Sequence, residues 1–222
     1  MLYNFCQEGK TFFAPNLKYV LAEVEVMDDD NELDLLKEEI LSKEKEIIEK
    51  YAFESDWGTK LGKNSLTSRS NNYNLLNFDN TKNLKEAIRN LHDLYLDIFG
   101  QKVEDDKYYV QVWANVLRKD ERMSAHRHAG DPYSYLTGNF CLDVDGTSTY
   151  YIHPLTDEIH ESENVNGKMT IFPSFIKHYT DPVSKGNKTP RMTLAFDIVT
   201  EECYKEFVKL YPNSQLMELY GN

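Results

Sequence analysis

The sequence predicts an α+β protein in which helices pack outside a barrel or sandwich of short β-strands. Three observations lead to this class. Apolar residues recur at helical spacing in the first half of the chain. All the strongest two-residue alternations of apolar and polar side chains lie after residue 107. Six of the seven prolines lie after residue 130, where strands and turns are expected.

Three helices are predicted from periodicity. The first covers roughly residues 32–51, and its apolar stripe consists of Leu33, Leu36, Ile40, Ile47 and Tyr51. The second covers residues 82–99 and ends before Gly100, a residue type that often follows the last helical turn. Its stripe consists of Leu84, Ala87, Ile88, Leu91, Tyr95 and Ile98. A third helix is expected over residues 201–210.

Five strands are predicted in the second half, over residues 108–117, 135–144, 149–152, 168–172 and 191–199. One face of each strand is apolar, and the other carries small or polar side chains. This pattern is expected where the second face lines a cavity. The 222 residues suit a single domain. We divide it into a helix-rich part (1–106) that packs on the barrel, a strand core (107–200) and a helical tail (201–222).

Composition narrows the range of partners. A formal net charge of -12 disfavours binding to nucleic acid phosphates. The three cysteines form no C-x-x-C pair and are interpreted as reduced thiols of a cytoplasmic protein. No apolar run approaches the roughly 18 residues of a membrane span, and no secretory signal is recognised at the N-terminus. A homodimer is compatible with the sequence.

The histidines indicate a metal site. His126 and His128 are two residues apart, so in an extended segment both imidazoles point the same way. His178 follows a later strand and a Pro-Ser turn. Two such histidines with one distant histidine can hold a metal ion and leave positions open for substrate. On spacing alone, exposed loop histidines are an equal alternative. His92, His153 and His160 are interpreted as structural or solvent-exposed residues.

Arg191 is the second candidate functional residue. It begins the last strand on the small and polar face, which also carries Thr193, Ala195 and Asp197. A guanidinium at the inner end of a cavity needs an anionic partner, and a small dicarboxylate would supply one. An ion pair with one of the 37 acidic residues is the structural alternative.

Residues 113–199 resemble the double-stranded β-helix core of the Fe(II)- and 2-oxoglutarate-dependent oxygenases. The closest resemblance is to an oxygenase family common in marine phages and bacteria, related to prolyl hydroxylases and aspartyl/asparaginyl β-hydroxylases. Five blocks carry the resemblance: Trp113-Ala114-Asn115, His126-Arg127-His128-Ala129-Gly130, Gly138-Asn139-Phe140, the segment from Gly167 to His178, and Pro190 to Phe196. They cover about two-fifths of the chain and are more specific for the superfamily than for any substrate.

The resemblance implies a jelly-roll or cupin-like barrel, flanked by the N-terminal helices. It implies that His126 and His178 hold Fe(II) and that Arg191 binds the far carboxylate of 2-oxoglutarate. Asn115, Tyr135 and Thr193 are candidate helpers in cosubstrate binding. The chain departs from the usual pattern at His128, where most of the superfamily has a carboxylate. His128 is therefore the candidate third ligand, with Asp131 as the fallback.

The implied activity is hydroxylation of a protein side chain, a peptide or a small molecule. It consumes O2 and 2-oxoglutarate, releases succinate and CO2, and uses ascorbate as a reductant in vitro. The location would be the host cytoplasm if the gene belongs to a phage. A cupin-like binding module is the main alternative. However, Phe175 replaces the glycine of the cupin P-x-G-x-x-H pattern, no glutamate follows the His pair, and Arg191 would be unexplained. A non-enzymatic interaction protein with a decayed site is a third reading, although intact His126, His178 and Arg191 argue against it.

Overall fold

The computed structural model describes residues 1–26, 30–53, 55–103, 106–144, 146–183 and 190–221. The described part contains three α-helices, α1 (Asp30–Lys50), α2 (Lys82–Ile98) and α3 (Glu201–Leu210). Two short 3-10 helices cover Thr67–Arg69 and Leu75–Asn77. The strands are β1 (Leu2–Asn4), β2 (Val20–Glu25), β3 (Tyr108–Leu117), β4 (Leu136–Asp143), β5 (Ser148–Ile152), β6 (Ile159–Glu163), β7 (Lys168–Pro173), β8 (Lys177–Thr180), β9 (Arg191–Thr200) and β10 (Met217–Glu218).

The strands form two antiparallel sheets. The larger has seven strands in the order β1-β2-β7-β4-β9-β3-β10, and the smaller has three in the order β6-β5-β8. No strand pair joins the two sheets within the described ranges, so hydrogen bonding does not close them into a barrel. The prediction of an α+β fold, with helices packed outside the strands, is confirmed. The closed barrel is not found, because the edge strands of each sheet are not paired with those of the other.

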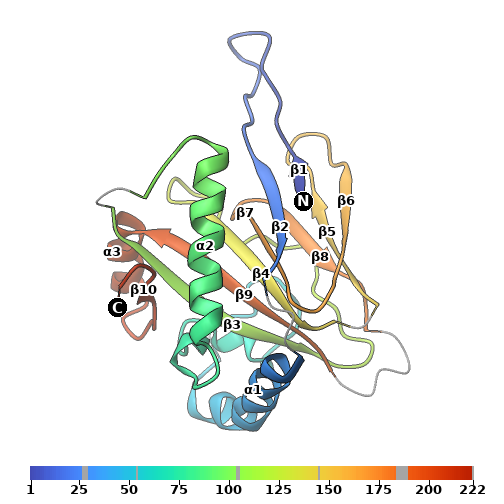
Figure 1. Ribbon diagram of the computed structural model, residues 1–222, viewed down its shortest axis with the longest axis vertical. Coiled ribbons are helices and arrows are strands. Elements are labelled where there is room, and N and C mark those ends of the chain that lie inside the picture. Colours follow the sequence, from blue (N-terminus) through green and yellow to red (C-terminus); the bar gives the residue numbers. More distant parts are fainter. Residues whose placement is uncertain (27–29, 54, 104–105, 145, 184–189, 222) are drawn as a thin grey trace.

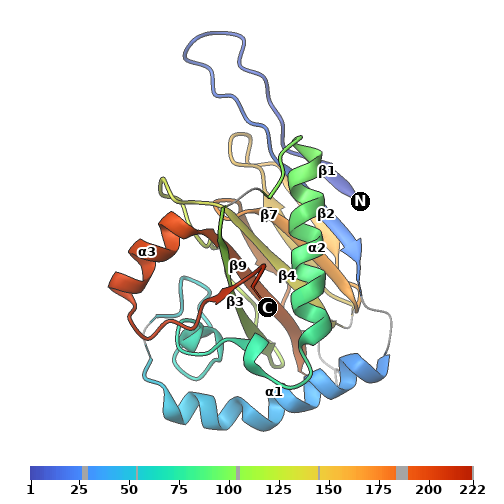
Figure 2. The same ribbon diagram turned by 60° about the vertical axis from the view of Figure 1, so that its left-hand side comes forward.

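Helix α2 covers one face of the large sheet, and α1 lies along one of its ends. In Figure 2, α2 lies across the sheet and α1 runs along its lower end. The predicted stripe of α2 is buried at Leu84, Ile88, Leu91 and Tyr95. Gly100 follows the helix with φ +65°, as a C-terminal glycine does. None of the helices in the described part of the chain is both long and apolar enough to cross a membrane.

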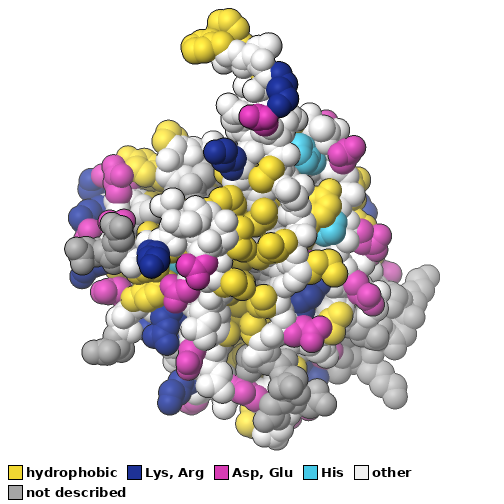
Figure 3. Space-filling view, turned by 45° about the horizontal axis from the view of Figure 1, so that its top comes forward, with side chains coloured by type: hydrophobic (Ala, Val, Ile, Leu, Met, Phe, Trp, Pro, Cys, Tyr) yellow, Lys and Arg dark blue, Asp and Glu magenta, His cyan; other side chains and the backbone are white. Residues whose placement is uncertain are grey.

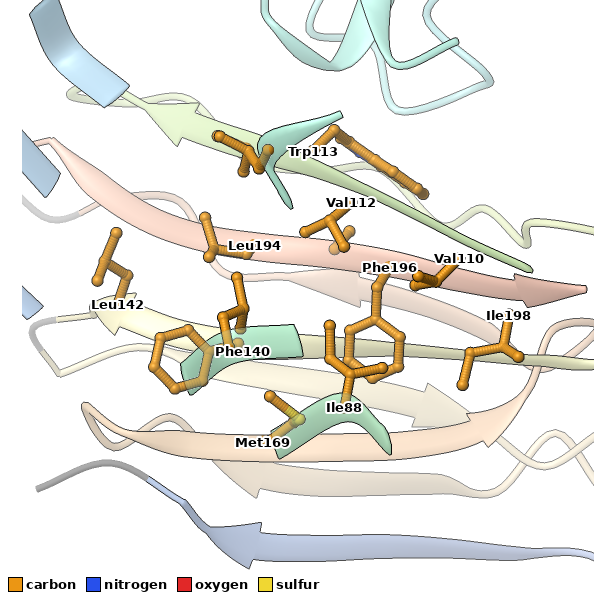
Figure 4. Close-up of a cluster of buried hydrophobic side chains, with 14 of the residues drawn as sticks. Ile88, Val110, Val112, Trp113, Phe140, Leu142, Met169, Leu194, Phe196 and Ile198 are labelled. Carbon is orange, nitrogen blue, oxygen red and sulfur yellow. The ribbon is translucent and has the colours of Figure 1, made fainter. Parts of the chain in front are cut away.

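The main core lies between α2 and the large sheet. Figure 4 shows Ile88 of α2 over side chains of β3, β4, β7 and β9, including Val112, Phe140 and Met169. On β9, Met192, Leu194, Phe196 and Ile198 enter this core, as the alternation predicted. The opposite face of β9 carries Arg191, Thr193 and Asp197. The sheet therefore has an apolar face toward α2 and a polar face that is free to build a site.

The N-terminal part of the chain contributes two strands to the large sheet in addition to helices. β1 and β2 form a hairpin, and β2 pairs with β7 to extend the large sheet. The tip of this hairpin projects from the body of the molecule (Figure 1) and carries the exposed Phe12 and Phe13. Yellow side chains mark this tip in Figure 3. Periodicity did not reveal these strands, because β1 has three residues and β2 only six.

Candidate metal and dicarboxylate site

His126, His128 and His178 come together as the spacing predicted. One ring nitrogen from each lies within 4.8 Å of one from each of the others. The backbone explains this arrangement. The amide of His126 donates to the carbonyl of His178 at 3.1 Å, and the amide of His178 donates back at 2.9 Å. The amide of His128 donates to the carbonyl of Ser174 at 3.0 Å. The extended segment 126–128 is thus fixed beside β8 and the turn before it.

The ring tautomers leave the Nε2 atoms free. His126 Nδ1 lies 2.8 Å from the carbonyl oxygen of Ser124, and His178 Nδ1 lies 3.1 Å from that of Ile176. A carbonyl oxygen only accepts, so each Nδ1 must carry the proton. Each Nε2 then keeps its lone pair, which is the form of imidazole that binds a metal ion.

His128 carries a proton on Nδ1 for a different reason. Its Nδ1 lies 2.6 Å from Asp197 Oδ1 and 2.8 Å from Thr137 Oγ1. The Thr137 hydroxyl donates its only proton to the carbonyl of Phe196, so it accepts from His128. Asp197 accepts as well. The residues therefore fit a metal ion: three imidazoles converge, and each is oriented through Nδ1 by an acceptor behind it.

The electrostatics favour neutral imidazoles. Burial, together with a smaller effect of the neighbouring His128, lowers the pKa of His126 to about 4. Burial also brings the pKa of His178 well below its ordinary value, with smaller effects from His126 and His128. Both side chains are therefore neutral at neutral pH and ready to bind a metal. An unshifted histidine would begin to lose a metal near pH 6.5. Because the pKa values of His126 and His178 are lowered, protons compete with a metal ion for these nitrogens only at more acidic pH.

The metal-free protein should lose stability in acid because of these shifts. The unfolded chain binds protons below about pH 6.5, whereas folded His126 resists protonation down to about pH 4. The contribution of His126 to the free energy of unfolding is therefore complete above pH 6.5. About 3 kcal/mol of it is lost as the pH falls from 6.5 to 4. Chemical denaturation across this range measures it. A His126→Gln variant should show a shallower decline, and an equal decline would contradict the assignment.

Arg191 is buried without an ion pair in the described residues. Its side chain is 2% exposed, and its Nε donates to Thr147 Oγ1 at 3.0 Å. Its Nη1 has no hydrogen-bond partner among the described residues. Burial lowers the pKa of the guanidinium, while Cys141, Tyr151 and Asp181 oppose that shift. A buried cation without an ion pair is costly, so an anionic ligand at this position would lower the free energy of the folded protein.

Tyr151 lies beside His178 and contributes to the electrostatic environment of Arg191. Its ring centroid lies 6.0 Å from that of His178, its partner across β5 and β8. Its hydroxyl accepts a hydrogen bond from Asn139 Nδ2 at 3.0 Å. Sequence reasoning missed Tyr151, Thr147 and Asp197. The alternation of β9 placed Asp197 on the polar face, but nothing local linked it to His128.

The other predicted residues have separate positions. Asn115 is buried and accepts a hydrogen bond from Thr67 at 2.7 Å, and it lies opposite the buried Thr193 in the β3–β9 pair. Tyr135 hydrogen-bonds through its hydroxyl to His92 of α2, on the helix side of the sheet. Asp131 accepts from the Tyr133 amide in its own turn and is not part of the histidine cluster. Any cosubstrate role of Asn115, Tyr135 and Thr193 stays a prediction.

His92 has a structural role in the core, which is one of the two roles expected from the sequence. The residue is fully buried, and its two ring nitrogens contact the hydroxyls of Tyr220 at 2.7 Å and Tyr135 at 2.8 Å. Both nitrogens are therefore satisfied without a metal ion.

A cavity of about 160 Å³ opens beside the histidine cluster. His126, His128 and Asp197 form part of its wall, and Trp57, Gln111 and Trp113 form another part. The exposed Arg127 also borders it. A second and larger cavity, of about 650 Å³, lies between the segment before β2, the last turn of α2 and the 130–135 turn. Tyr135 lines it, but none of the three clustered histidines does. The smaller cavity is therefore the one with access to a bound metal ion.

The comparisons with known proteins identify the fold. No family model matches the chain, and no curated protein matches it. A prolyl-4-hydroxylase from Pseudomonas putida is similar in structure, with a TM-score of 0.51, 11% identity and coverage of 81% of this chain and 87% of that one. A prolyl hydroxylase from Trichoplax adhaerens, solved with a hypoxia inducible factor peptide fragment, has a TM-score of 0.48 and 9% identity, covering 84% of this chain and 86% of that one. The chain has the fold of the Pseudomonas prolyl-4-hydroxylase.

Proposed function

We propose that this protein is an Fe(II)- and 2-oxoglutarate-dependent oxygenase. Its iron would be held by His126, His128 and His178, through the Nε2 atoms that the tautomers leave free. The bound iron and cosubstrate would supply oxidation of a substrate C–H bond, coupled to conversion of 2-oxoglutarate and O2 into succinate and CO2. The prime substrate is a protein side chain, a peptide or a small molecule.

The unpaired guanidinium of Arg191 is the observation that carries this proposal. A metal site alone would equally suit a cupin-like binding module. Arg191 Nη1 has no partner among the described residues, although the side chain is almost completely buried. A dicarboxylate that reaches from the metal site would complete it with charge-assisted hydrogen bonds. Tyr151, which contacts His178 and influences Arg191, lies where such a molecule would pass.

The protein's own residues would orient and shield the cosubstrate. Thr147 holds Arg191 Nε, so the guanidinium presents its other nitrogens in a fixed direction. Asn139 fixes the hydroxyl of Tyr151. The interior around them is closed by buried side chains such as Phe172 and Ile176. Exclusion of water strengthens each of these electrostatic contacts and protects the reaction from side products.

Asp197 would replace the missing carboxylate ligand indirectly. It donates no ligand atom to the cluster, but its carboxylate accepts the Nδ1 proton of His128 at 2.6 Å. A carboxylate behind a ligating imidazole raises its basicity and fixes its orientation. We therefore expect Asp197→Asn to weaken metal binding by roughly 10–100-fold. Metal titration of the two proteins checks this, and Asp131→Asn is the matched control. Equal affinities in Asp197→Asn and wild type would contradict the role.

The direct test is a spectroscopic titration without oxygen. Fe(II) is added to the purified protein, followed by 2-oxoglutarate, and the metal-to-2-oxoglutarate absorption band is recorded. A saturable band is expected from the oxygenase. Iron binding without a band that depends on 2-oxoglutarate would instead favour the cupin-like module. Succinate as the control ligand should give no band, because it lacks the keto acid that chelates the metal.

A further inference from the structure

Gln111, one of the residues that line the cavity beside the histidines, has a buried acceptor atom without a donor. Gln111 lies on β3 directly opposite Asp197, and its side chain is 5% exposed. Its Nε2 donates to the carbonyl of Ser70 at 2.7 Å and also to that of Tyr73. Carbonyls only accept, so the amide nitrogen must face them and the orientation of the amide is settled. The Oε1 atom, on the other side, has no partner among the described residues.

Trp113, which lines the same cavity, has a buried donor atom without an acceptor. Trp113 lies two residues along β3, on the same face as Gln111. Its side chain is 7% exposed, and its ring centroid lies 5.4 Å from that of His128. An indole Nε1–H can only donate, and this one has no partner in the described part of the chain. A buried polar group without a partner costs free energy that a bound ligand can recover.

We propose that this cavity binds the carboxamide group of the prime substrate, with its carbonyl accepting from Trp113 and its N–H donating to Gln111. The inference rests on the proposed oxygenase function and narrows its substrate class. A carboxamide offers an acceptor oxygen and a donor nitrogen bonded to the same carbon, which complements the two unpaired groups. The cavity volume of about 160 Å³ is large enough for the end of a side chain and too small for most metabolites.

A carboxylate is a poorer fit for the same place. Its oxygens would face the Oε1 of Gln111, which repels a negative charge, and the carboxylate of Asp197 borders the cavity as well. Arg127 also borders the cavity, but its side chain is exposed to solvent, where its charge is screened. An amide therefore meets two complementary groups, whereas a carboxylate meets one complementary and one opposing group.

The experiment uses the two tryptophans as reporters. The chain contains only Trp57 and Trp113, and both border the cavity. A spectrum of indole N–H groups in the ¹⁵N-labelled protein should therefore show two signals, and Trp57→Phe assigns them. The sample is full-length protein with Zn²⁺ and saturating 2-oxoglutarate but without iron, so that 2-oxoglutarate occupies metal positions that propionate could otherwise take and no turnover takes place. A hydrogen bond accepted by a ligand carbonyl should move the Trp113 proton signal downfield.

Three probes of nearly equal size separate the contributions. Propionamide carries both the donor and the acceptor, methyl acetate keeps only the acceptor, and propionate carries the charge. We expect a saturable downfield shift with propionamide, with an affinity of millimolar order for so small a ligand. Methyl acetate should move the same signal more weakly, and propionate should bind at least about tenfold less tightly than propionamide.

Trp113→Phe tests the donor directly, because it removes the N–H and keeps an aromatic ring. Propionamide affinity, now followed on ligand signals, should fall about three- to tenfold. The wild-type probe series stands even if this variant fails to fold. Propionate binding as tightly as propionamide would overturn the proposal, and so would a Trp113 signal that propionamide does not move. Succinate release measured separately would then show whether the oxygenase function survives without this substrate class.

Discussion

Arg191→Ala is expected to weaken 2-oxoglutarate binding by roughly 2–5 kcal/mol while leaving metal binding nearly intact. The guanidinium is 2% exposed and has an unpaired Nη1, so it would meet the far carboxylate in a site with little solvent. Its removal leaves that carboxylate without a counter-charge. The metal-binding nitrogens belong to other residues and should not be affected. Titration of 2-oxoglutarate into the Fe(II)-loaded variant without oxygen measures the loss.

Two further variants serve as controls for the Arg191→Ala titration. Arg122→Ala removes an exposed arginine and should bind 2-oxoglutarate like wild type. Arg191→Met fills the same space without a charge and is expected not to lower the free energy of unfolding of the ligand-free protein, since an unpaired buried charge is itself costly. Unchanged 2-oxoglutarate affinity in a folded, metal-loaded Arg191→Ala protein would show that the far carboxylate binds elsewhere.

His178→Ala should abolish the slow release of succinate that wild-type protein is expected to show without a prime substrate. His178 provides the ligand from β8, and its loss leaves only the two histidines of one short segment. Two neighbouring imidazoles hold a divalent ion much less tightly than three that surround it. The assay contains Fe(II), ascorbate, O2 and 2-oxoglutarate, and the product measured is succinate. Metal content after dialysis gives an independent reading.

His160→Ala is the matched control for this experiment. His160 lies on β6 and stacks on Tyr3 with ring centroids 3.8 Å apart, outside the histidine cluster. The variant should release succinate like wild type. If His178→Ala and wild type release equal amounts, the succinate comes from free iron in solution and the site is not its source.

Local sequence patterns determined the long elements. α2 and α3 and the strands β3 and β9 agree with their predicted ranges to within one residue, because each repeats its apolar period several times. The shorter strands β1, β2, β6, β8 and β10 were missed. β8 has only four residues, and its pairing with β5 rather than its own pattern makes it a strand. Short strands depend on their partners for both stability and register.

In the candidate site, too, some features follow from the local sequence and others depend on contacts between distant segments. His126 and His128 could be paired from the sequence because two-residue spacing in an extended chain is a local property. Their approach to His178 depends on backbone hydrogen bonds between segments about 50 residues apart. The link from His128 to Asp197 spans 69 residues. A chain with 37 acidic residues offers many partners for any cation, so only the fold could choose among them.

By itself, the sequence determined an α+β chain with a histidine pair, a distant histidine and an arginine on the polar face of the last strand. Only the tertiary structure decided that the three imidazoles converge, that Asp197 stands behind His128, and that Arg191 is buried without a carboxylate partner among the described residues. The physical reason is that the convergence of the imidazoles and the missing partner of Arg191 depend on three-dimensional packing. They depend on which distant segments pack together, and no local period records that choice.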